Sequence, residues 1–350
     1  MFDQDGETAI ERALLAAHPG AQPLRFANPT PGKHDLAGGL AILVEEPVPH
    51  WLVVSRGFTE LEDKVEEDPD VSGWGFELTC RLPVRSQDHD FGWVLSWMQN
   101  IADYLADNAT FLEPYHHMPM YPATSEDEIA AIVFVDDIEL APTESRNGRL
   151  TFLQMVGLTS GEYEALQSWN GPSLVDLIHA RDPLFLMDVE RKTYLREEAF
   201  ARAVEQGRER DGSSTGVLYG LGILWFKNAN EIQVHLDPSA ARAVRTSAKA
   251  RLSHRNPMLF FGDPRKTLRP DGSLVLHSQV NIVLHSEDGP SEISELEGRK
   301  VAVIRLSDAA VRELDAVLRD EPGSYVLPSL PRVRFVVATA QRLREPTYPW

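Results

Sequence analysis

The stretch 148–171 constrains the fold of this 350-residue chain more than any other part of the sequence. Asn147 and the glycine after it form a turn dipeptide, because Gly adopts positive φ freely and Asn tolerates it. The run 150–156 is apolar on both faces, interrupted only by Thr151 and Gln154. A strand covered on both sides is therefore predicted here.

A capped helix is predicted directly after this strand. Thr159 and Glu162 have the spacing of a capping box, in which each side chain satisfies a backbone N–H of the first helical turn. The helix is expected to run to about Trp169 and to end at Asn170-Gly171 in the left-handed conformation, with Pro172 opening the next helix.

Three separated motifs carry a family resemblance. They are TFLQMVG at 151–157, followed after eleven residues by WNG at 169–171; GWGFELTCRL at 73–82; and LMDVER at 186–191. Together and in this order they resemble the signature of the Suppressor of fused (SUFU) family. The resemblance is strong over the first two hundred residues and weaker afterwards. The compact junction at 227–230 and the arginine bias among the basic residues suggest a bacterial member.

The predicted fold class is α+β, with a mixed α/β N-terminal domain and a smaller, β-rich C-terminal domain. The polar, glycine-bearing stretch 206–216 favours a domain boundary. We therefore predict an N-terminal domain over 1–210, a linker over 211–216 and a C-terminal domain over 217–350. Hydrophobic periodicity predicts helices at 5–18, 91–106 and 197–208, and strands at 40–45, 51–58, 73–82, 129–135 and 184–187.

The segment after Asp237-Pro238 is ambiguous. The Asp-Pro pair is a good helix start, yet apolar residues from Val244 to Leu252 alternate with polar ones. We predict a single helical turn followed by a strand, which the resemblance also favours.

Charge and cysteine content narrow the class of partner. The net charge of −19 arises from 53 acidic and 34 basic residues. Such a surface repels phosphate backbones and favours basic partners, so a protein partner is expected and a nucleic acid is not. The first residues lack a signal peptide pattern and no apolar run reaches transmembrane length, so no membrane association is expected. The single cysteine, Cys80, fits a reducing cytoplasm.

Catalytic and metal-binding patterns are weak in this sequence. The run 212–216 matches G-x-S-x-G, but a nucleophile elbow needs a strand before it and a helix after it, and here the order is reversed. His116-His117 and Asp88-His89-Asp90 lack the spacing of a metal site, because neighbouring strand residues point to opposite faces. We expect no enzyme activity, no catalytic residue, no metal and no cofactor.

The resemblance implies a site for protein capture. In the family, two domains close on a partner segment that adds as a β-strand between an edge of each. Tyr104, Thr110, Phe111 and His116 match the family's N-terminal positions, and 241–247, with Ala243 and Arg245, matches its C-terminal edge strand. Animal members have an acid just before the histidine, whereas this chain has Tyr115. From the residues alone, an equally good interpretation is that Phe111 lies in the core and that Tyr115 is only a loop residue.

Three functions remain open at this point. The first is a non-catalytic binding protein of the Suppressor of fused type, serving as an immunity protein that neutralises a toxin. The second is a regulator that sequesters a transcription factor or another protein. The third is a hydrolase-type enzyme, which rests only on scattered His, Asp and Ser residues.

Overall fold

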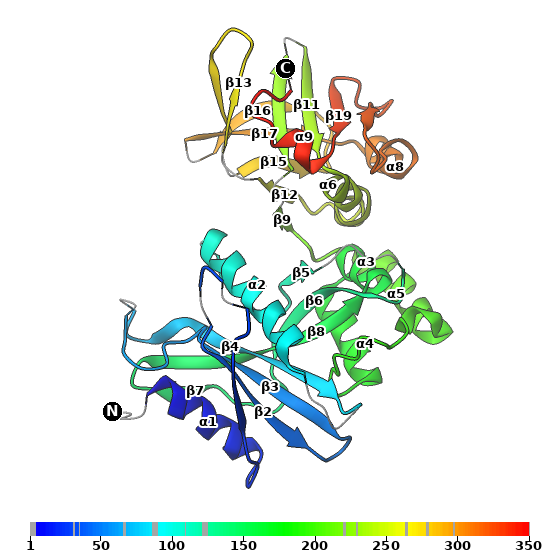
Figure 1. The fold of residues 1–350 in the computed structure, drawn as a ribbon. Helices are drawn as coiled ribbons and strands as arrows, with labels where there is room; N and C mark the ends of the chain where they lie inside the picture. Colours follow the sequence, from blue (N-terminus) through cyan, green and yellow to red (C-terminus); the bar gives the residue numbers. More distant parts are fainter. Residues whose placement is uncertain are drawn as a thin grey trace. The chain divides into compact units, whose positions relative to one another are not determined.

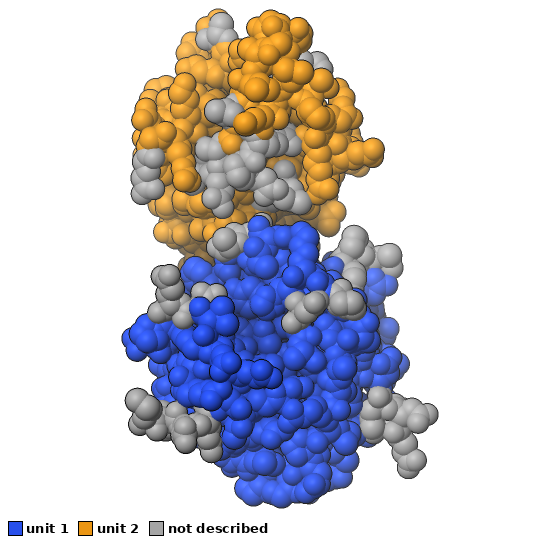
Figure 2. All heavy atoms as spheres, turned by 60° about the vertical axis from the view of Figure 1, so that its left-hand side comes forward, with its two compact units in different colours: residues 1–163, 176–196 blue, residues 164–175, 197–350 orange. Residues whose placement is uncertain are grey.

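The computed structural model describes residues 5–30, 32–34, 36–65, 68–85, 90–108, 110–120, 125–219, 222–228, 230–262, 265–277, 280–296 and 298–349. The chain divides into two compact units (Figure 2). Unit 1 comprises residues 1–163 and 176–196, and unit 2 comprises residues 164–175 and 197–350. The predicted domain boundary at 211–216 stays a prediction. The α+β class is confirmed by the helices and sheets that follow.

Unit 1 is built on one large sheet. Eight strands of its described residues join in the order β1-β2-β3-β4-β8-β6-β5, and β7 also pairs with β8. The elements are α1 (Gly6–Ala17), β1 (Leu24–Ala27), β2 (Gly38–Val44), β3 (His50–Arg56), β4 (Val71–Pro83), α2 (Gly92–Asn108), β5 (His117–Pro119), β6 (Ile129–Asp136), β7 (Thr143–Ser145), β8 (Gly148–Thr159) and the 3₁₀ turn η1 (Tyr194–Arg196). Helices α3 (Ser160–Ser168) and α4 (Gly171–Arg181) cross the division between the units.

The large sheet is covered by a helix on each face (Figure 1). Alternate side chains of β2, β3 and β8 pack with α1 in one cluster, and the intervening ones pack with α2 in another. Leu150 and Phe152 belong to the α1 cluster, whereas Leu153 and Met155 belong to the α2 cluster. The prediction of a strand buried on both faces is thus confirmed, and the period of two explains it.

The capping box at the end of β8 is confirmed. The Thr159 N–H donates to Glu162 Oε2 at 3.0 Å, and the Glu162 N–H donates to Thr159 Oγ1 at 3.5 Å. The predicted left-handed end of α3 is wrong, since Asn170 instead caps α4 by accepting from the Ser173 N–H at 3.0 Å. A short polar side chain before Gly-Pro serves equally well as an N-cap.

The predicted strand at 184–187 is wrong, because these residues lie in a loop. The carboxylate of Asp182 accepts from the backbone N–H groups of Leu184 and Leu186. The Met187 N–H donates to the Arg81 carbonyl at 2.7 Å. The loop is therefore fixed by one aspartate and by a contact with β4, and the apolar run reflects burial against the sheet rather than pairing in it.

Unit 2 contains several smaller sheets. Its described strands form one sheet ordered β10-β11-β19-β18, a second ordered β16-β17-β15-β12-β9, and the pair β13-β14. The elements are α5 (Glu198–Asp211), β9 (Val217–Tyr219), β10 (Leu224–Asn228), β11 (Glu231–Leu236), α6 (Pro238–Ala243), the π-helical turn η2 (Val244–Ala248), α7 (Lys249–Leu252), β12 (Met258–Phe261), β13 (Arg265–Leu268), β14 (Leu274–His277), β15 (Val280–His285), β16 (Glu292–Leu296), β17 (Arg299–Arg305), α8 (Asp308–Val317), β18 (Gly323–Tyr325), β19 (Val333–Val337) and α9 (Ala340–Leu343).

The predicted strand at 241–247 is also wrong. Residues 238–252 are helical throughout, as α6, η2 and α7. Asp237 caps the segment by accepting from the Ala240 N–H at 2.8 Å, and Pro238 occupies the first turn. Val244, Ala248 and Leu252 are fully buried at helical spacing. The apparent alternation arose because the helical interval of four residues is also a multiple of two.

Candidate functional site

The candidate site in unit 1 is the segment that follows α2 and ends in β5. In the sheet order given above, β5 is an edge strand, paired with β6 alone. The segment is tied to β6 through backbone bonds from the Tyr115 N–H to the Phe134 carbonyl at 2.7 Å and from the Phe134 N–H to the His116 carbonyl at 2.9 Å. Tyr115 has a φ of 70°, a left-handed conformation that costs energy for any residue with a Cβ.

Aromatic side chains gather on this segment and are exposed. Phe111 is 59% exposed and Tyr115 is 44% exposed, which excludes the interpretation of Phe111 as a core residue. The rings of Phe111 and His116 lie with centroids 6.1 Å apart. His116 Nε2 lies 3.8 Å from the Glu113 carboxylate. Tyr104, one turn before the end of α2, is 36% exposed. The structure thus brings Phe111 and His116 together beside an exposed Tyr115.

His117, the first residue of β5, is in a different environment from His116. Burial is the main cause that lowers the pKa of His117 to about 4, and the nearby charge of His116 adds to this. Its ring packs edge-on against Tyr163 with centroids 5.5 Å apart. The His117 imidazole is therefore neutral at physiological pH and contributes to packing. The edge of β5 is then defined by Pro119 and by the backbone.

The C-terminal residues expected at the site lie on a helix rather than on an edge strand. Ala243 is 7% exposed at the end of α6. Arg245 is in η2, where its guanidinium lies 3.3 Å from the Asp320 carboxylate. A role of these two residues in partner binding stays a prediction, but their contribution as a strand edge is excluded.

β9 is one of the two edge strands of the described five-stranded sheet in unit 2, and β16 is the other. β9 runs parallel to β12, and the Leu259 N–H donates to the Gly216 carbonyl at 2.9 Å. In a parallel ladder with this register, Val217 and Tyr219 direct their backbone N–H groups away from β12. Val217 is 40% exposed and Tyr219 is 63% exposed. The short β-branched and aromatic run after Gly216 indicates a strand, but not that this strand lies at the edge of a sheet.

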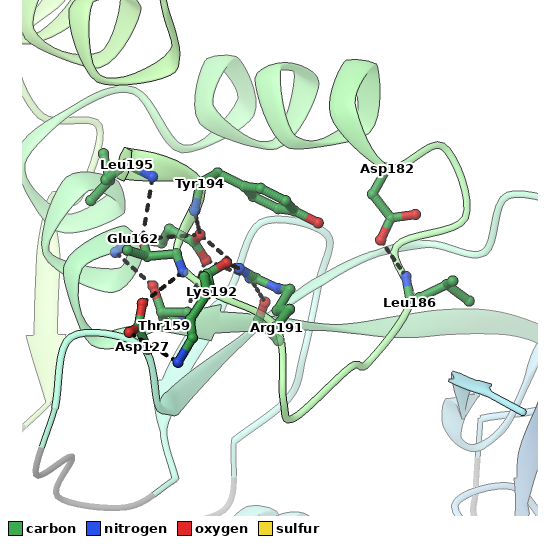
Figure 3. A network of polar contacts seen from close by, with 11 residues as sticks. Asp127, Thr159, Glu162, Asp182, Leu186, Arg191, Lys192, Tyr194 and Leu195 are labelled. Atoms are coloured by element: carbon green, nitrogen blue, oxygen red, sulfur yellow. Dashed lines mark hydrogen bonds and ion pairs between the residues drawn. The ribbon is translucent and has the colours of Figure 1, made fainter. Parts of the chain in front are cut away.

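A buried polar network holds the β8–α3 corner (Figure 3). The Glu162 side chain is fully buried and accepts from Arg191 Nη1 at 2.8 Å, Arg191 Nη2 at 2.5 Å and the Tyr194 N–H at 2.8 Å. Arg191 also donates to the Gly157 carbonyl at 2.9 Å and lies over the Tyr194 ring. Burial lowers the pKa of Arg191, but its bonds to Glu162 outweigh this and the pKa is raised.

This network joins two of the sequence motifs. Its glutamate comes from the capping box, and its arginine ends the LMDVER run. The neighbouring Thr193 N–H donates to Asp127 Oδ1 at 3.1 Å, and Asp127 also pairs with Lys192 and Arg196. The network fixes the 188–196 loop against the sheet, so these residues support the fold rather than form an open reaction site.

Two further carboxylates are buried in unit 1. Arg81 donates to Asp137 at 2.8 Å, and both side chains are fully buried. Glu77 is fully buried and accepts from Thr59 Oγ1 at 2.6 Å and from the Thr59 N–H at 3.0 Å. Burial raises the pKa of Glu77, although its hydrogen bonds act in the opposite direction. Each carboxylate is fully engaged by donors of the fold.

Among the described residues, those with catalytic or metal-binding patterns do not lie together in one cluster. Ser214, the central residue of G-x-S-x-G, accepts from the Gly171 N–H at 2.9 Å and lies between helix α5 and strand β9. No group of three His, Cys, Asp or Glu side chains suited to a metal occurs in the described part of the chain. Of the predicted Asp88-His89-Asp90 triplet, residues 88 and 89 lie outside the described residues. No helix of the described residues is long and apolar enough to span a bilayer.

The fold and the two edges described above define a two-unit α+β protein with exposed aromatic side chains just before β5 and in β9. Residues 37–192 match the family model described as "Suppressor of fused protein (SUFU)", so this region of the chain is similar to the Suppressor of fused family. The predicted family is confirmed.

Two curated relatives and two solved structures are similar to the chain. The "Suppressor of fused homolog" proteins of Homo sapiens and Mus musculus are each 30% identical over 181 residues, covering 47% of this chain. The match spans only 37% of the length of either relative. The crystal structure of Drosophila Suppressor of Fused has a TM-score of 0.67 at 16% identity and covers 96% of this chain and 97% of that chain. A second solved structure, "the Sufu-Fu complex crystal structure", has a TM-score of 0.50 at 20% identity, covering 58% and 98%. Both show a shared fold.

Proposed function

We propose that the protein is a non-catalytic binding protein that captures another protein by strand addition at its exposed sheet edges. The observation that carries this proposal is β9, where Val217 and Tyr219 have exposed side chains and a register that directs their backbone N–H groups away from β12. An extended partner segment gains affinity from main-chain hydrogen bonds and specificity from side-chain contacts in such an arrangement. The solved Sufu-Fu complex supports the proposal, because by its name a protein of similar fold forms a complex there.

The edge of β5 is the second proposed contact. Its three residues include Pro119, which has no N–H, so this edge offers few outward backbone donors. Phe111, Tyr115 and His116 therefore supply side-chain contacts rather than a long ladder. Such an aromatic cluster beside an edge is the kind of surface that anchors a partner.

A proline substitution at position 217 tests strand addition. Val217→Pro removes one of the two outward N–H groups of β9 and leaves the bonds to β12, whereas Val217→Thr keeps this N–H and a β-branched side chain. Partner proteins captured from an extract of the source organism are compared for the wild type and both variants. We expect the proline variant alone to lose a captured protein. An identical captured set for all three proteins would overturn strand addition at β9.

The acidic composition favours a basic partner and thus the role of an immunity protein. A net charge of −19 accelerates association with a basic toxin domain, such as a nuclease, through long-range attraction. Deletion of this gene is compared in strains with and without each neighbouring gene. Immunity predicts that deletion is lethal only while a neighbouring toxin gene is present. Equal viability in every background would exclude it.

A regulator that sequesters a transcription factor or another protein is the second candidate. It uses the same edges but holds a short extended peptide, whereas a toxin domain binds as a folded body. Peptide mapping of the captured partner distinguishes them: a single strand-forming segment that retains binding favours the regulator. In either role we propose a cytoplasmic protein, which the single buried cysteine, Cys80, supports.

A further inference from the structure

Unit 2 contains a pocket that belongs to neither proposed edge. It has a volume of about 1030 Å³ and is lined by residues of β10, of the β13–β14 hairpin and of the start of β17 with the glycine before it. β13, β16 and β17 lie on the same side of unit 2 (Figure 1). The volume is at the upper end of the range for ligand pockets.

The rim of this pocket is basic, although the chain as a whole is strongly acidic. Four cationic side chains line it, together with one carboxylate: Lys227, Arg269, Arg299, Lys300 and Asp271. Asp271 accepts hydrogen bonds from the N–H and the hydroxyl of Ser273, at 2.9 and 2.6 Å. Its carboxylate therefore stabilises the turn in which it lies. Within the described ranges, neither Lys227 nor Arg299 has an ion-pair or hydrogen-bond partner for its side chain.

Several other arginines of unit 2 are paired with carboxylates. Arg305 and Arg334, for example, each pair with glutamates at 2.7 to 3.0 Å. Lys227 and Arg299, which lack a side-chain partner among the described residues, therefore indicate a place for an external anion in this basic rim.

The floor of the pocket is aromatic and follows a strand edge. Trp225, Phe226, Lys227 and Asn228 are consecutive residues of β10, and all four line the pocket. Side chains of a strand alternate between its faces, so four consecutive residues reach one pocket only where it runs along the strand's edge. β10 is an edge strand of its described sheet. His277 packs edge-on against Phe226, with centroids 5.2 Å apart, and closes the floor.

The geometry points to an acidic, extended peptide segment of a protein partner as the occupant of this pocket. Carboxylates of the segment pair with Lys227 and Arg299, an apolar side chain covers Trp225, and the backbone follows the edge of β10. The elongated course along a strand favours a peptide over a compact anion such as a nucleotide. The site is separate from β9 and does not depend on strand addition there.

Fluorescence anisotropy tests this assignment with the full chain. The probe is a fluorescein-labelled eight-residue peptide in which glutamate alternates with leucine and phenylalanine, and the control peptide has glutamine in place of glutamate. We expect saturable binding of the acidic probe only, although the overall negative charge of the protein opposes it. Lys227→Glu and Arg299→Glu should each weaken binding about 5-fold or more, which is the scale of losing one close charge pair at an interface.

Matched variants separate a local site from a general charge effect. Arg312→Glu reverses an exposed cation on α8, outside the pocket, and should change binding by less than about 2-fold. Val217→Pro, which disables β9, should leave probe binding intact. Equal weakening by Arg312→Glu, absence of saturable binding, or saturable binding of ATP or inorganic phosphate without binding of the peptide would each overturn the proposal.

Discussion

Arg191 and Glu162 form a bidentate ion pair, in which Nη1 lies 2.8 Å from Oε1 and Nη2 lies 2.5 Å from Oε2. The Glu162 carboxylate is fully excluded from solvent. The pair joins the 188–196 loop to the start of α3, two parts of the chain that are distant in sequence. Removing one partner of such a pair leaves the other as an uncompensated buried charge, which is costly. The pair is therefore a sensitive measure of how firmly this loop is held.

Arg191→Met should lower the free energy of unfolding by about 3–5 kcal/mol, because Glu162 is left charged and buried. Urea denaturation of the full chain measures the change. The matched control is Arg202→Met, whose side chain is 62% exposed and pairs only with Glu198 on α5. The control should change stability by about 0.5 kcal/mol or less. Equal losses in the two variants would contradict the role assigned to the buried pair.

Asp137→Asn should destabilise the protein in a pH-dependent manner. Burial raises the pKa of Asp137, but hydrogen bonds and charge from Arg81 outweigh it and the pKa is lowered below its ordinary value. The resulting stabilisation is fully present above the unfolded pKa, about 3.9, and is lost as the pH falls through the folded pKa. The difference in stability between wild type and variant should thus be constant from about pH 5 to 7 and shrink below about pH 4.

Urea denaturation at pH 3 to 7 checks the Asp137 prediction. Asp107→Asn is the control, because the Asp107 side chain is 51% exposed and pairs only with the exposed Lys33. Its stability should follow that of the wild type at every pH. A difference for Asp137→Asn that grows as the pH falls would show that the Arg81 pair does not stabilise the charged carboxylate.

Glu77→Gln should show the opposite dependence on pH. Burial raises the pKa of Glu77 above its ordinary value, which its hydrogen bonds only partly offset. A raised pKa of an acid contributes stability that is fully present below the unfolded pKa, about 4.3, and is lost as the pH rises through the folded pKa. Glutamine stays neutral, so the cost of the substitution should shrink as the pH rises above about 4.

The same denaturation series, with Glu77→Ala beside it, tests the Glu77 prediction. The Oε1 of Glu77 accepts from Gly57 and Thr59, and an amide oxygen can keep these bonds. Alanine leaves the donors unsatisfied and should cost more than glutamine at every pH, by about 1–3 kcal/mol. A glutamine cost that rises with pH would mean that the hydrogen bonds to the charged form outweigh burial.

The sequence predicted the helices and strands of unit 1 well where the burial pattern of a segment alone determines its secondary structure. The two-faced strand β8 and the capping box at Thr159 and Glu162 follow from local patterns, and the structure contains both. The failures at 184–187 and 241–247 have one cause. Short apolar runs fit a strand, a helix or a packed loop equally, and contacts from elsewhere in the chain decide among them. Asp182 holds the first as a loop, and the cap at Asp237 starts the second as a helix.

The candidate site was only partly predictable, because exposure at a sheet edge depends on the order of strands. Phe111 and Tyr115 were named from a family resemblance, and the structure shows both to be exposed. The edge at β9 was missed, since no local pattern states that Val217 and Tyr219 belong to the last strand of a sheet. The Arg191–Glu162 pair was likewise hidden, as its partners are separated by twenty-nine positions.

Tyr115→Gly should separate stability from binding at the segment before β5. Tyr115 has a φ of 70°, and this conformation costs a residue with a Cβ about 1–2 kcal/mol, while glycine gives back about 0.5–1 kcal/mol in the entropy of the unfolded chain. The variant should therefore be as stable as the wild type or about 1 kcal/mol more stable, which thermal and urea denaturation measure.

Its capture of a partner should nevertheless weaken, because an exposed aromatic contact is lost. Tyr115→Asn, which also tolerates left-handed backbone, is the control for a change in loop flexibility and should weaken capture to the same extent. Undiminished capture by both variants would remove Tyr115 from the binding surface, and a loss of stability beyond about 1 kcal/mol would mean that its side chain serves packing instead.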